Sequence, residues 1–218
     1  MDSFLDTNVP LAYVFSIEPK NTIAKKIFKL YDKYFWSNNV RQEFEHRFDQ
    51  KQTTLSSFFN DLKRNVEKSN TTYFTKREMM QFAHAWDYDS EKQQKDIIQA
   101  AKNFWNIYLP YTPRPEKREL ENKLREFLMD LNSRTYQKAN NVPNLFNQEI
   151  VRTKDYPKIF AKFAKFKMGE CDKEIILDAH DFGFNHPIDF ITFDDECKKG
   201  ALIDELSFNN VLGRFDFY

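Results

Sequence analysis

Two aspartates of this 218-residue chain, Asp6 and Asp194, each follow a short apolar segment that is predicted to be a strand. In an open parallel sheet, ligands bind outside the carboxyl ends of the strands, so both side chains are expected in one crevice. Glu43 lies early in a predicted helix, and Asp172 lies at the start of another. All four carboxylates are therefore expected to meet at one edge of the sheet.

Carboxylates brought together in this way repel one another, and some would be protonated unless a cation balances them. Mg²⁺ and Mn²⁺ suit oxygen ligands, and Mg²⁺ needs only one or two carboxylates because it keeps several waters. One or two such ions can activate a water and stabilise the leaving oxygen when a phosphodiester bond is cut. The pattern therefore predicts a site for one or two divalent cations, which could support phosphodiester hydrolysis by an activated water without a covalent enzyme intermediate.

The strands that would position these acids are short. Strands are expected at 3–5, 34–36 and 188–193, with late edge strands at 206–208 and 215–218. Helices are expected from Pro10, from Asn38 or Asn39, and over 171–179. Strands and helices alternate at both ends of the chain, which is typical of an α/β fold with a mostly parallel sheet.

The central part of the chain is predicted to be almost entirely helical. Apolar residues recur there at helical spacing, and the first such stripe, which is expected to pack as core, contains Phe58, Phe59, Leu62 and Val66. We interpret residues 53–154 as a helical insertion in a single domain whose core is 1–52 and 155–218. The insertion is expected to select substrate, to bind a partner protein or to mediate self-association.

Four stretches of the sequence resemble, in order, the successive motifs of the PIN-domain nucleases. They are FLDTN at 4–8, SNNVRQE at 37–43, GECDKEIILDA at 169–179 and ITFDD at 191–195. The family shows a strand-ending Asp with a polar pair, a Glu near a helix start, an Asp opening a helix, and an Asp two positions after a Thr. The resemblance covers about residues 1–50 and 168–218, and the central helices exceed those of a typical member.

The resemblance implies a metal-dependent endonuclease, most often acting on RNA, built on a Rossmann-like three-layer fold with a mostly parallel sheet. It implies Mg²⁺ or Mn²⁺ as the cofactor and RNA rather than DNA as the partner. The residues that match the acidic metal-binding set are Asp6, Glu43, Asp172 and Asp194. By the same likeness, Asp195 is an accessory acid at the metal, and Asn8 and Thr192 orient the ligands or a water.

Cations near these acids are candidates for contact with nucleic acid. Arg41 and Arg47 flank Glu43, and a predicted basic helix over 152–167 leads towards Asp172. Lys158, Lys162 and Lys165 fall on one face of that helix, which is either simply solvated or in contact with phosphates. Lys and Arg contacts to phosphate supply most of the affinity for nucleic acid that does not depend on sequence.

Some of the matched acids have close competitors. Glu45 is two residues beyond Glu43 and points elsewhere on its helix. Glu170 competes with Asp172 as a ligand or as a helix cap, whereas Asp178, nearly two turns further, is expected to be solvated. The position of Thr192 favours Asp194 over Asp195 as the ligand that ends the strand.

Other functions leave weaker signals. The pairs Arg41 with His46 and Arg77 with His84 resemble the motif of the HEPN ribonucleases, which are helical and metal-free. A PIN-like scaffold without catalysis, acting as an adaptor through its insertion, is a second alternative. The cysteines and the nearby histidines lack the close pairs that structural zinc sites show, so zinc is not favoured.

Composition limits the class of protein. Lys and Arg together balance Asp and Glu at 33 each, so a globally basic nucleic-acid binder is not indicated and any such contact must be a local patch. The two cysteines, Cys171 and Cys197, are too few for a disulfide framework and are expected to be reduced. No apolar run is long enough to span a bilayer and no signal peptide is visible, so a cytoplasmic protein without membrane contact is expected.

Overall fold

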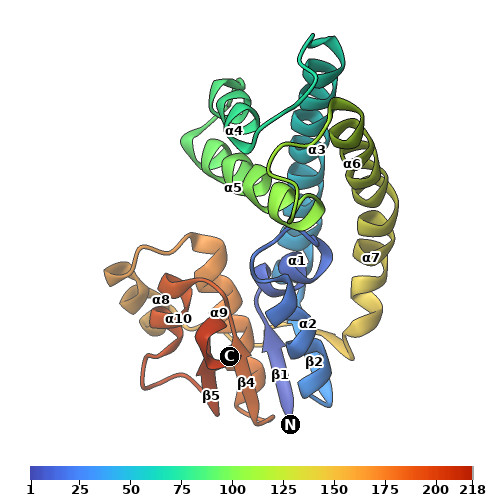
Figure 1. The fold of residues 1–218 in the computed structure, drawn as a ribbon. Helices are drawn as coiled ribbons and strands as arrows, with labels where there is room; N and C mark the ends of the chain where they lie inside the picture. Colours follow the sequence, from blue (N-terminus) through green and yellow to red (C-terminus); the bar gives the residue numbers. More distant parts are fainter. Residues whose placement is uncertain (218) are drawn as a thin grey trace. The chain divides into compact units, whose positions relative to one another are not determined.

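The computed structural model describes residues 1–217 and contains a five-stranded sheet in which every pair of neighbouring strands is parallel (Figure 1). The strand order is β3-β2-β1-β4-β5. The strands are β1 (Asp2–Leu5), β2 (Lys33–Ser37), β3 (Gln148–Ile150), β4 (Ile188–Ile191) and β5 (Asn210–Leu212). The predicted α/β class with a mostly parallel sheet is confirmed.

The chain adds strands first on one side of β1 and then on the other. It passes from β1 through β2 to β3, and then returns to place β4 and β5 beyond the opposite edge of β1. The order therefore reverses between β1 and β4, which is the kind of switch point where open α/β sheets bind ligands. Asp6 follows β1 and Thr192 follows β4, so both lie at this point.

Helices cover the two faces of the sheet. One face is covered by α1 (Asn8–Val14), α2 (Asn21–Leu30) and the start of α3 (Asn38–Lys68), since Tyr34 and Trp36 pack on Phe28 and Phe44. The other face carries α9 (Glu170–Gly183) and α10 (Asp195–Ala201), which contact each other, and the Phe35 ring packs on α9. Alternate side chains of β2 therefore point to opposite layers, as strand geometry requires.

The strands are almost wholly buried, which suits parallel strands covered on both faces. Phe4 and Leu5 of β1 and Phe190 of β4 are fully buried, and the rings of Phe4 and Phe190 stack. β3 and β5 are shorter and less buried because they form the edges. The apolar centre of the sheet thus holds β1 and β4 rigidly beside each other.

Most of the remaining elements lie between β2 and β3 in the chain, two lie between β3 and β4, and one follows β5. They are α4 (Lys76–Ala85), α5 (Glu91–Tyr108), α6 (Lys117–Met129), the π-helix η1 (Asp130–Thr135), α7 (Tyr136–Asn141), η2 (Val142–Leu145), α8 (Pro157–Lys162), η3 (Phe163–Lys165) and η4 (Arg214–Phe217). No helix in the described part of the chain is long and apolar enough to cross a membrane.

The chain divides into two compact units. The sheet unit contains residues 1–14, 20–48 and 139–218, and the helical unit contains 15–19 and 49–138. The sequence placed the insertion over about 53–154. In the structure β3 and the chain that follows it are part of the sheet unit, because β3 pairs with the end of β2.

The helical unit has an aromatic core of its own. Phe58 and Phe59 of α3 are fully buried, as predicted, and the Phe59 ring lies 5.2 Å from that of Phe104 and 4.4 Å from that of Phe127. These rings bring α5 and α6 against the second half of α3. Close-packed aromatic cores of this kind tolerate truncation poorly.

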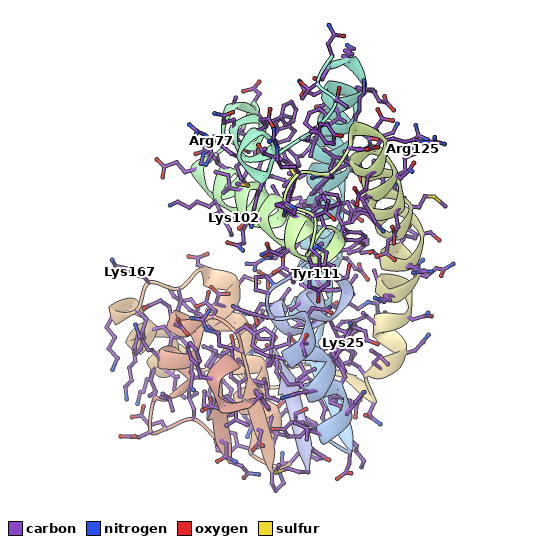
Figure 2. The ribbon with its side chains drawn as sticks, in the orientation of Figure 1. Lys25, Arg77, Lys102, Tyr111, Arg125 and Lys167 are labelled. Atoms are coloured by element: carbon purple, nitrogen blue, oxygen red, sulfur yellow. The ribbon has the colours of Figure 1, made fainter. Side chains whose placement is uncertain are left out.

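We expect Phe59→Ala to lower the free energy of unfolding by about 3–5 kcal/mol, because it leaves a cavity between three helices. The matched control is Tyr111→Ala, since Tyr111 is 94% exposed and its loss should change the stability by no more than about 0.5 kcal/mol (Figure 2). Thermal unfolding followed by circular dichroism measures both. Equal melting temperatures for the two variants would contradict the packing of this unit.

Two sequence predictions about local structure are wrong. The predicted basic helix over 152–167 begins only at Pro157 and gives way to η3 at Phe163, while residues 151–156 have no regular secondary structure. The late strand is Asn210–Leu212, not 206–208, and Arg214–Phe217 is a 3₁₀ helix instead of a strand. The last residue of that predicted strand, Tyr218, lies outside the described residues.

Candidate functional site

Asp6 lies at the centre of the site, where β1 ends. Its side chain is almost fully buried, with 2% of the residue exposed. The backbone N–H of Thr7 donates to one carboxylate oxygen at 2.6 Å, and the Thr192 hydroxyl donates to the other at 2.6 Å. The Asn8 amide donates to that second oxygen as well. Three donors therefore converge on a side chain that the fold keeps out of solvent.

Asn8 and Thr192 connect the ends of β1 and β4. The Asn8 side-chain oxygen accepts from the backbone N–H of Phe193 at 2.7 Å, which fixes the orientation of its amide. The Thr192 hydroxyl oxygen in turn accepts from Asn8 at 3.2 Å and from the backbone N–H of Asp194 at 3.0 Å. These two residues, which the sequence predicted to orient ligands, thus hold Asp6 and set the turn that leads into Asp194.

Glu43 reaches the same region from α3. It stands on the second turn of that helix, and its side chain is 11% exposed. The Thr7 hydroxyl donates to Glu43, and Arg47, one turn further along α3, forms an ion pair with it at 2.5 Å. Thr7 therefore links Glu43 to the loop that carries Asp6, a role that the sequence analysis did not assign.

Asp172 and Asp194 both stand at helix starts. Asp172 is in the first turn of α9 and accepts from the backbone N–H of Gly169 at 3.0 Å. Asp194 is the N-cap of α10 and accepts from the backbone N–H groups of Glu196 and Cys197 at 2.8 and 3.0 Å. Short polar side chains are favoured at these positions because they satisfy the free N–H groups of the first turn.

The four acids influence one another electrostatically. Burial, together with the charges of Asp172 and Glu43, raises the pKa of Asp6 to about 7, although the hydrogen bonds from Thr192 and Thr7 act in the opposite direction. Burial also raises the pKa of Asp172, as do the charges of Glu43 and Asp194, whereas the Gly169 N–H and Arg47 lower it. The site therefore concentrates negative charge, and Arg47 offsets only part of it.

Two thiols lie beside these acids and are protonated at neutral pH. Burial and the charges of Asp6, Asp172 and Asp194 hold the pKa of Cys197 well above its usual value. Burial and the charges of Glu43 and Asp172 raise the pKa of Cys171 to about 12. Both cysteines are unbridged, as predicted. Neither is set up as a nucleophile, because the thiolate is the reactive form.

The structure does not bring every predicted residue to this cluster. Asp195 is exposed and its carboxylate faces Arg214 at 4.0 Å, while Arg41 pairs with Glu149 and Glu45. Within residues 1–217, no three His, Cys, Asp or Glu side chains stand close enough together to hold a metal ion as they are. The four acids thus share a charged region without their oxygens meeting at one point.

The predicted basic face is exposed but partly engaged. Lys158 is exposed on α8, Lys162 pairs with Glu205, and Lys165 lies over the ring of Phe166. Lys167, two residues before Gly169, projects outward from the segment that leads into α9 (Figure 2). These side chains remain accessible to a polyanion, although they do not form the single helical face that the sequence suggested.

Asp178 was predicted to be solvated, and this is wrong. It is 3% exposed and accepts a hydrogen bond from the Asn39 amide at 2.8 Å. Arg152 faces it with Nε at 3.7 Å and also pairs with Glu174 at 2.5 Å. The partners of Asp178 come from distant parts of the chain, so its burial left no signal in the helical pattern of α9.

The histidines of the alternative ribonuclease motifs lie on helix surfaces. His46 and His84 are both exposed. Arg41 and His46 are five residues apart on α3, which places them on different sides of the helix at about 100° per residue. Arg77 and His84 of α4 are seven residues apart and share a face, but no hydrogen bond or ion pair joins them in the described structure.

Comparison with protein-family models, with curated proteins and with solved structures finds no match for this chain.

Proposed function

We propose that this chain is a metal-dependent endonuclease of the PIN type that hydrolyses phosphodiester bonds in RNA. The observation that carries the proposal is the gathering of Asp6, Glu43, Asp172 and Asp194 at the switch point between β1 and β4. They come from four separate segments of the chain. The charges of Asp172 and Glu43 act on Asp6, and those of Glu43 and Asp194 act on Asp172. The proposal of RNA over DNA rests on the resemblance to the PIN family alone.

The donor set fits Mg²⁺ or Mn²⁺. Every candidate ligand is a carboxylate oxygen, which is the ligand type these ions prefer. The buried Asp6 lacks a cationic partner in the described structure, and its raised pKa expresses the cost of leaving that charge unbalanced. A divalent cation would remove the cost, and binding it requires the four acids to draw closer than they stand now.

The residues of the chain have separable tasks in this proposal. Asp6, Glu43, Asp172 and Asp194 would hold the cation, with Asp195 as an accessory acid. Asn8 and Thr192 keep Asp6 oriented, and Thr7 does the same for Glu43. The bound ion would supply activation of a water and stabilisation of charge on the leaving oxygen. Rigid positioning of the ligands keeps the cost of reorganisation low during the reaction.

The test is cleavage of labelled single-stranded RNA and DNA by the pure protein with Mn²⁺ and with EDTA. We expect cutting of RNA that needs Mn²⁺ and stops in EDTA. Cutting that survives EDTA would overturn the metal mechanism and favour the histidines of the metal-free alternative. RNA binding without any cutting, over a set of diverse RNA sequences, would favour the adaptor.

Arg47 is expected to restrain metal binding, because its guanidinium already neutralises Glu43 and acts on Asp172. We predict that Arg47→Met binds Mn²⁺ about three- to tenfold more tightly, since one positive charge leaves the site. Arg41→Met is the matched control, because Arg41 is on the same helix but pairs with Glu45 and Glu149. Isothermal titration calorimetry with MnCl₂ measures both. Equal affinities for the two variants would show that Arg47 does not act on the metal site.

A further inference from the structure

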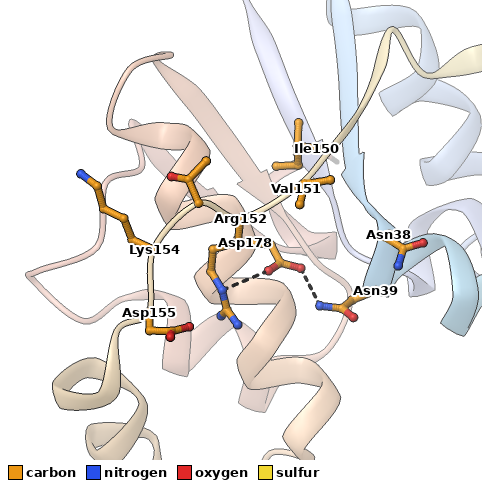
Figure 3. Close-up of a pocket in the computed structure, with 9 residues that line it drawn as sticks. Asn38, Asn39, Ile150, Val151, Arg152, Lys154, Asp155 and Asp178 are labelled. Atoms are coloured by element: carbon orange, nitrogen blue, oxygen red, sulfur yellow. Dashed lines mark hydrogen bonds and ion pairs between the residues drawn. The ribbon is translucent and has the colours of Figure 1, made fainter.

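A polar pocket lies at the carboxyl-terminal edge of the sheet (Figure 3). Its volume is about 310 Å³, and it is lined by the first two residues of α3, by residues 150–155 and by Asp178 of α9. β2 and β3 end at paired residues, Ser37 and Ile150, so the pocket stands at the carboxyl ends of these two strands. Asp6 and Asp194 follow the neighbouring strands β1 and β4.

Arg152 lines this pocket, and one of its hydrogen-bond donors is unused. Its Nη2 pairs with Glu174. Its Nε faces Asp178 (Figure 3). Its Nη1 is buried and has no partner in the structure. A buried donor without an acceptor costs free energy, and a guanidinium has no acceptor capacity of its own. The pocket therefore favours a ligand that presents an acceptor to Arg152.

The charges around Arg152 do not favour a phosphate. Glu174 and Asp178 pair with Arg152. Asp155 also lines the pocket and extends into the same space as the Arg152 guanidinium (Figure 3). A further anion would add repulsion there. A neutral ligand that carries an acceptor for Arg152 and N–H donors for a carboxylate would satisfy both sides.

The edge of a nucleobase carries such acceptors and donors side by side. Val151, whose residue is 77% exposed at the rim, offers an apolar surface to the face of a ring, and the Asn38 amide adds a further polar contact. Proteins read single-stranded RNA by taking unstacked bases into pockets and bonding their edges. Guanine suits this pocket best, because it has the acceptor O6 beside adjacent N–H donors.

The pocket and the acids share two helices. Asn39 and Glu43 are one turn apart on α3, and Asp178 follows Asp172 by six residues on α9, about 9 Å along the axis. A strand lying across the carboxylate cluster would thus bring a neighbouring nucleotide to the pocket. We infer that the pocket around Arg152 and Asp155 binds an unpaired base, preferably guanine, of the RNA substrate, an inference that rests on the proposed function.

The test measures binding without cleavage. Fluorescence anisotropy in EDTA compares an oligouridine with three copies that carry one internal guanine, adenine or cytosine. The variant is Asp155→Asn, because Asp155 is exposed and its loss should not disturb folding. Asp204→Asn, another exposed aspartate of the sheet unit, is the matched control for lost charge. We expect the wild type to prefer the guanine oligonucleotide, and Asp155→Asn to weaken its binding at least about fivefold with little change for oligouridine.

Two outcomes would overturn the inference. Uniformly tighter binding of all four oligonucleotides by Asp155→Asn would show that the pocket contacts phosphate. Unchanged binding of all four oligonucleotides by Asp155→Asn would show that the pocket does not bind a base and that Arg152 has only a structural role in its ion pairs. Cleavage assays with Mn²⁺ separate this inference from the proposed function. A preference for guanine in binding without any RNA cleavage would support the base pocket and refute the nuclease. RNA cleavage without a preference for guanine in binding would support the nuclease and refute the base pocket.

Discussion

Asp6→Asn is expected to reduce metal-dependent RNA cleavage by about 10³-fold, more than the roughly 10–100-fold that loss of an outer-shell partner typically costs. The physical reason is that Asp6 is the most buried of the four acids and has the strongest shift in pKa. Its replacement removes a charge from the centre of the cluster. It also replaces one of the two accepting oxygens by an NH₂ group, so at least one of the donors from Thr7, Asn8 and Thr192 faces another donor.

The control for this experiment is Asp189→Asn. Asp189 is a fully buried carboxylate of the neighbouring strand β4, but it bonds to Tyr31 and Asn210 near the other end of the strand. It therefore tests the cost of changing a buried aspartate without touching the cluster. Initial cleavage rates of labelled RNA in Mn²⁺ give the comparison at matched fractions of folded protein. Similar losses in both variants would mean that Asp6 acts only through stability.

The second large effect is on stability in the absence of metal. The pKa of Asp6 is raised from 3.8 to about 7 in the folded protein, so the folded state holds this proton over a range in which the unfolded chain has released it. The wild type is therefore expected to lose stability as the pH rises from about 4 to about 7, by about 4 kcal/mol from this group. Asp6→Asn has no such proton to lose.

The difference in the free energy of unfolding between wild type and Asp6→Asn isolates the contribution of Asp6, because the raised pKa values of Asp172 and Asp178 affect both proteins. Urea unfolding in EDTA near pH 4 and near pH 8 measures it as a change in the stability gap between wild type and Asp6→Asn. We expect the stability of Asp6→Asn relative to that of the wild type to increase as the pH rises. Saturating Mn²⁺ should restore the wild type at the higher pH and leave the variant unchanged. A gap independent of pH would contradict the buried, unbalanced charge at Asp6.

The centre of the fold was predictable because its signals are local. β1, β2 and β4 are short apolar runs with clear ends, and Asp6 and Asp194 stand where those runs stop. Parallel strands joined by helices then place such ends at one edge of a sheet. The predictions that Asn8 and Thr192 accompany Asp6 came from the family resemblance, and their hydrogen bonds to it are seen in the structure.

The edge strands and the second pocket left weaker signals. β3 is three residues long with only Ile150 buried, so it shows neither an apolar run nor a clear alternation. The recurrence of lysines predicted a helix from 152, but Pro157 disfavours helix in the residue before it and suits the first position of one. The partnership of Arg152 with Asp178 joins residues from separate elements, and no local pattern encodes it.

The most direct test of the central claim is a crystal of the wild-type protein soaked in MnCl₂, measured for anomalous scattering from manganese. We predict a peak enclosed by Asp6, Glu43, Asp172 and Asp194, which have moved closer to one another than in the metal-free chain, and no peak at this place in Asp6→Asn. A wild-type crystal that shows no manganese among these four residues, or shows it only elsewhere, would contradict the account.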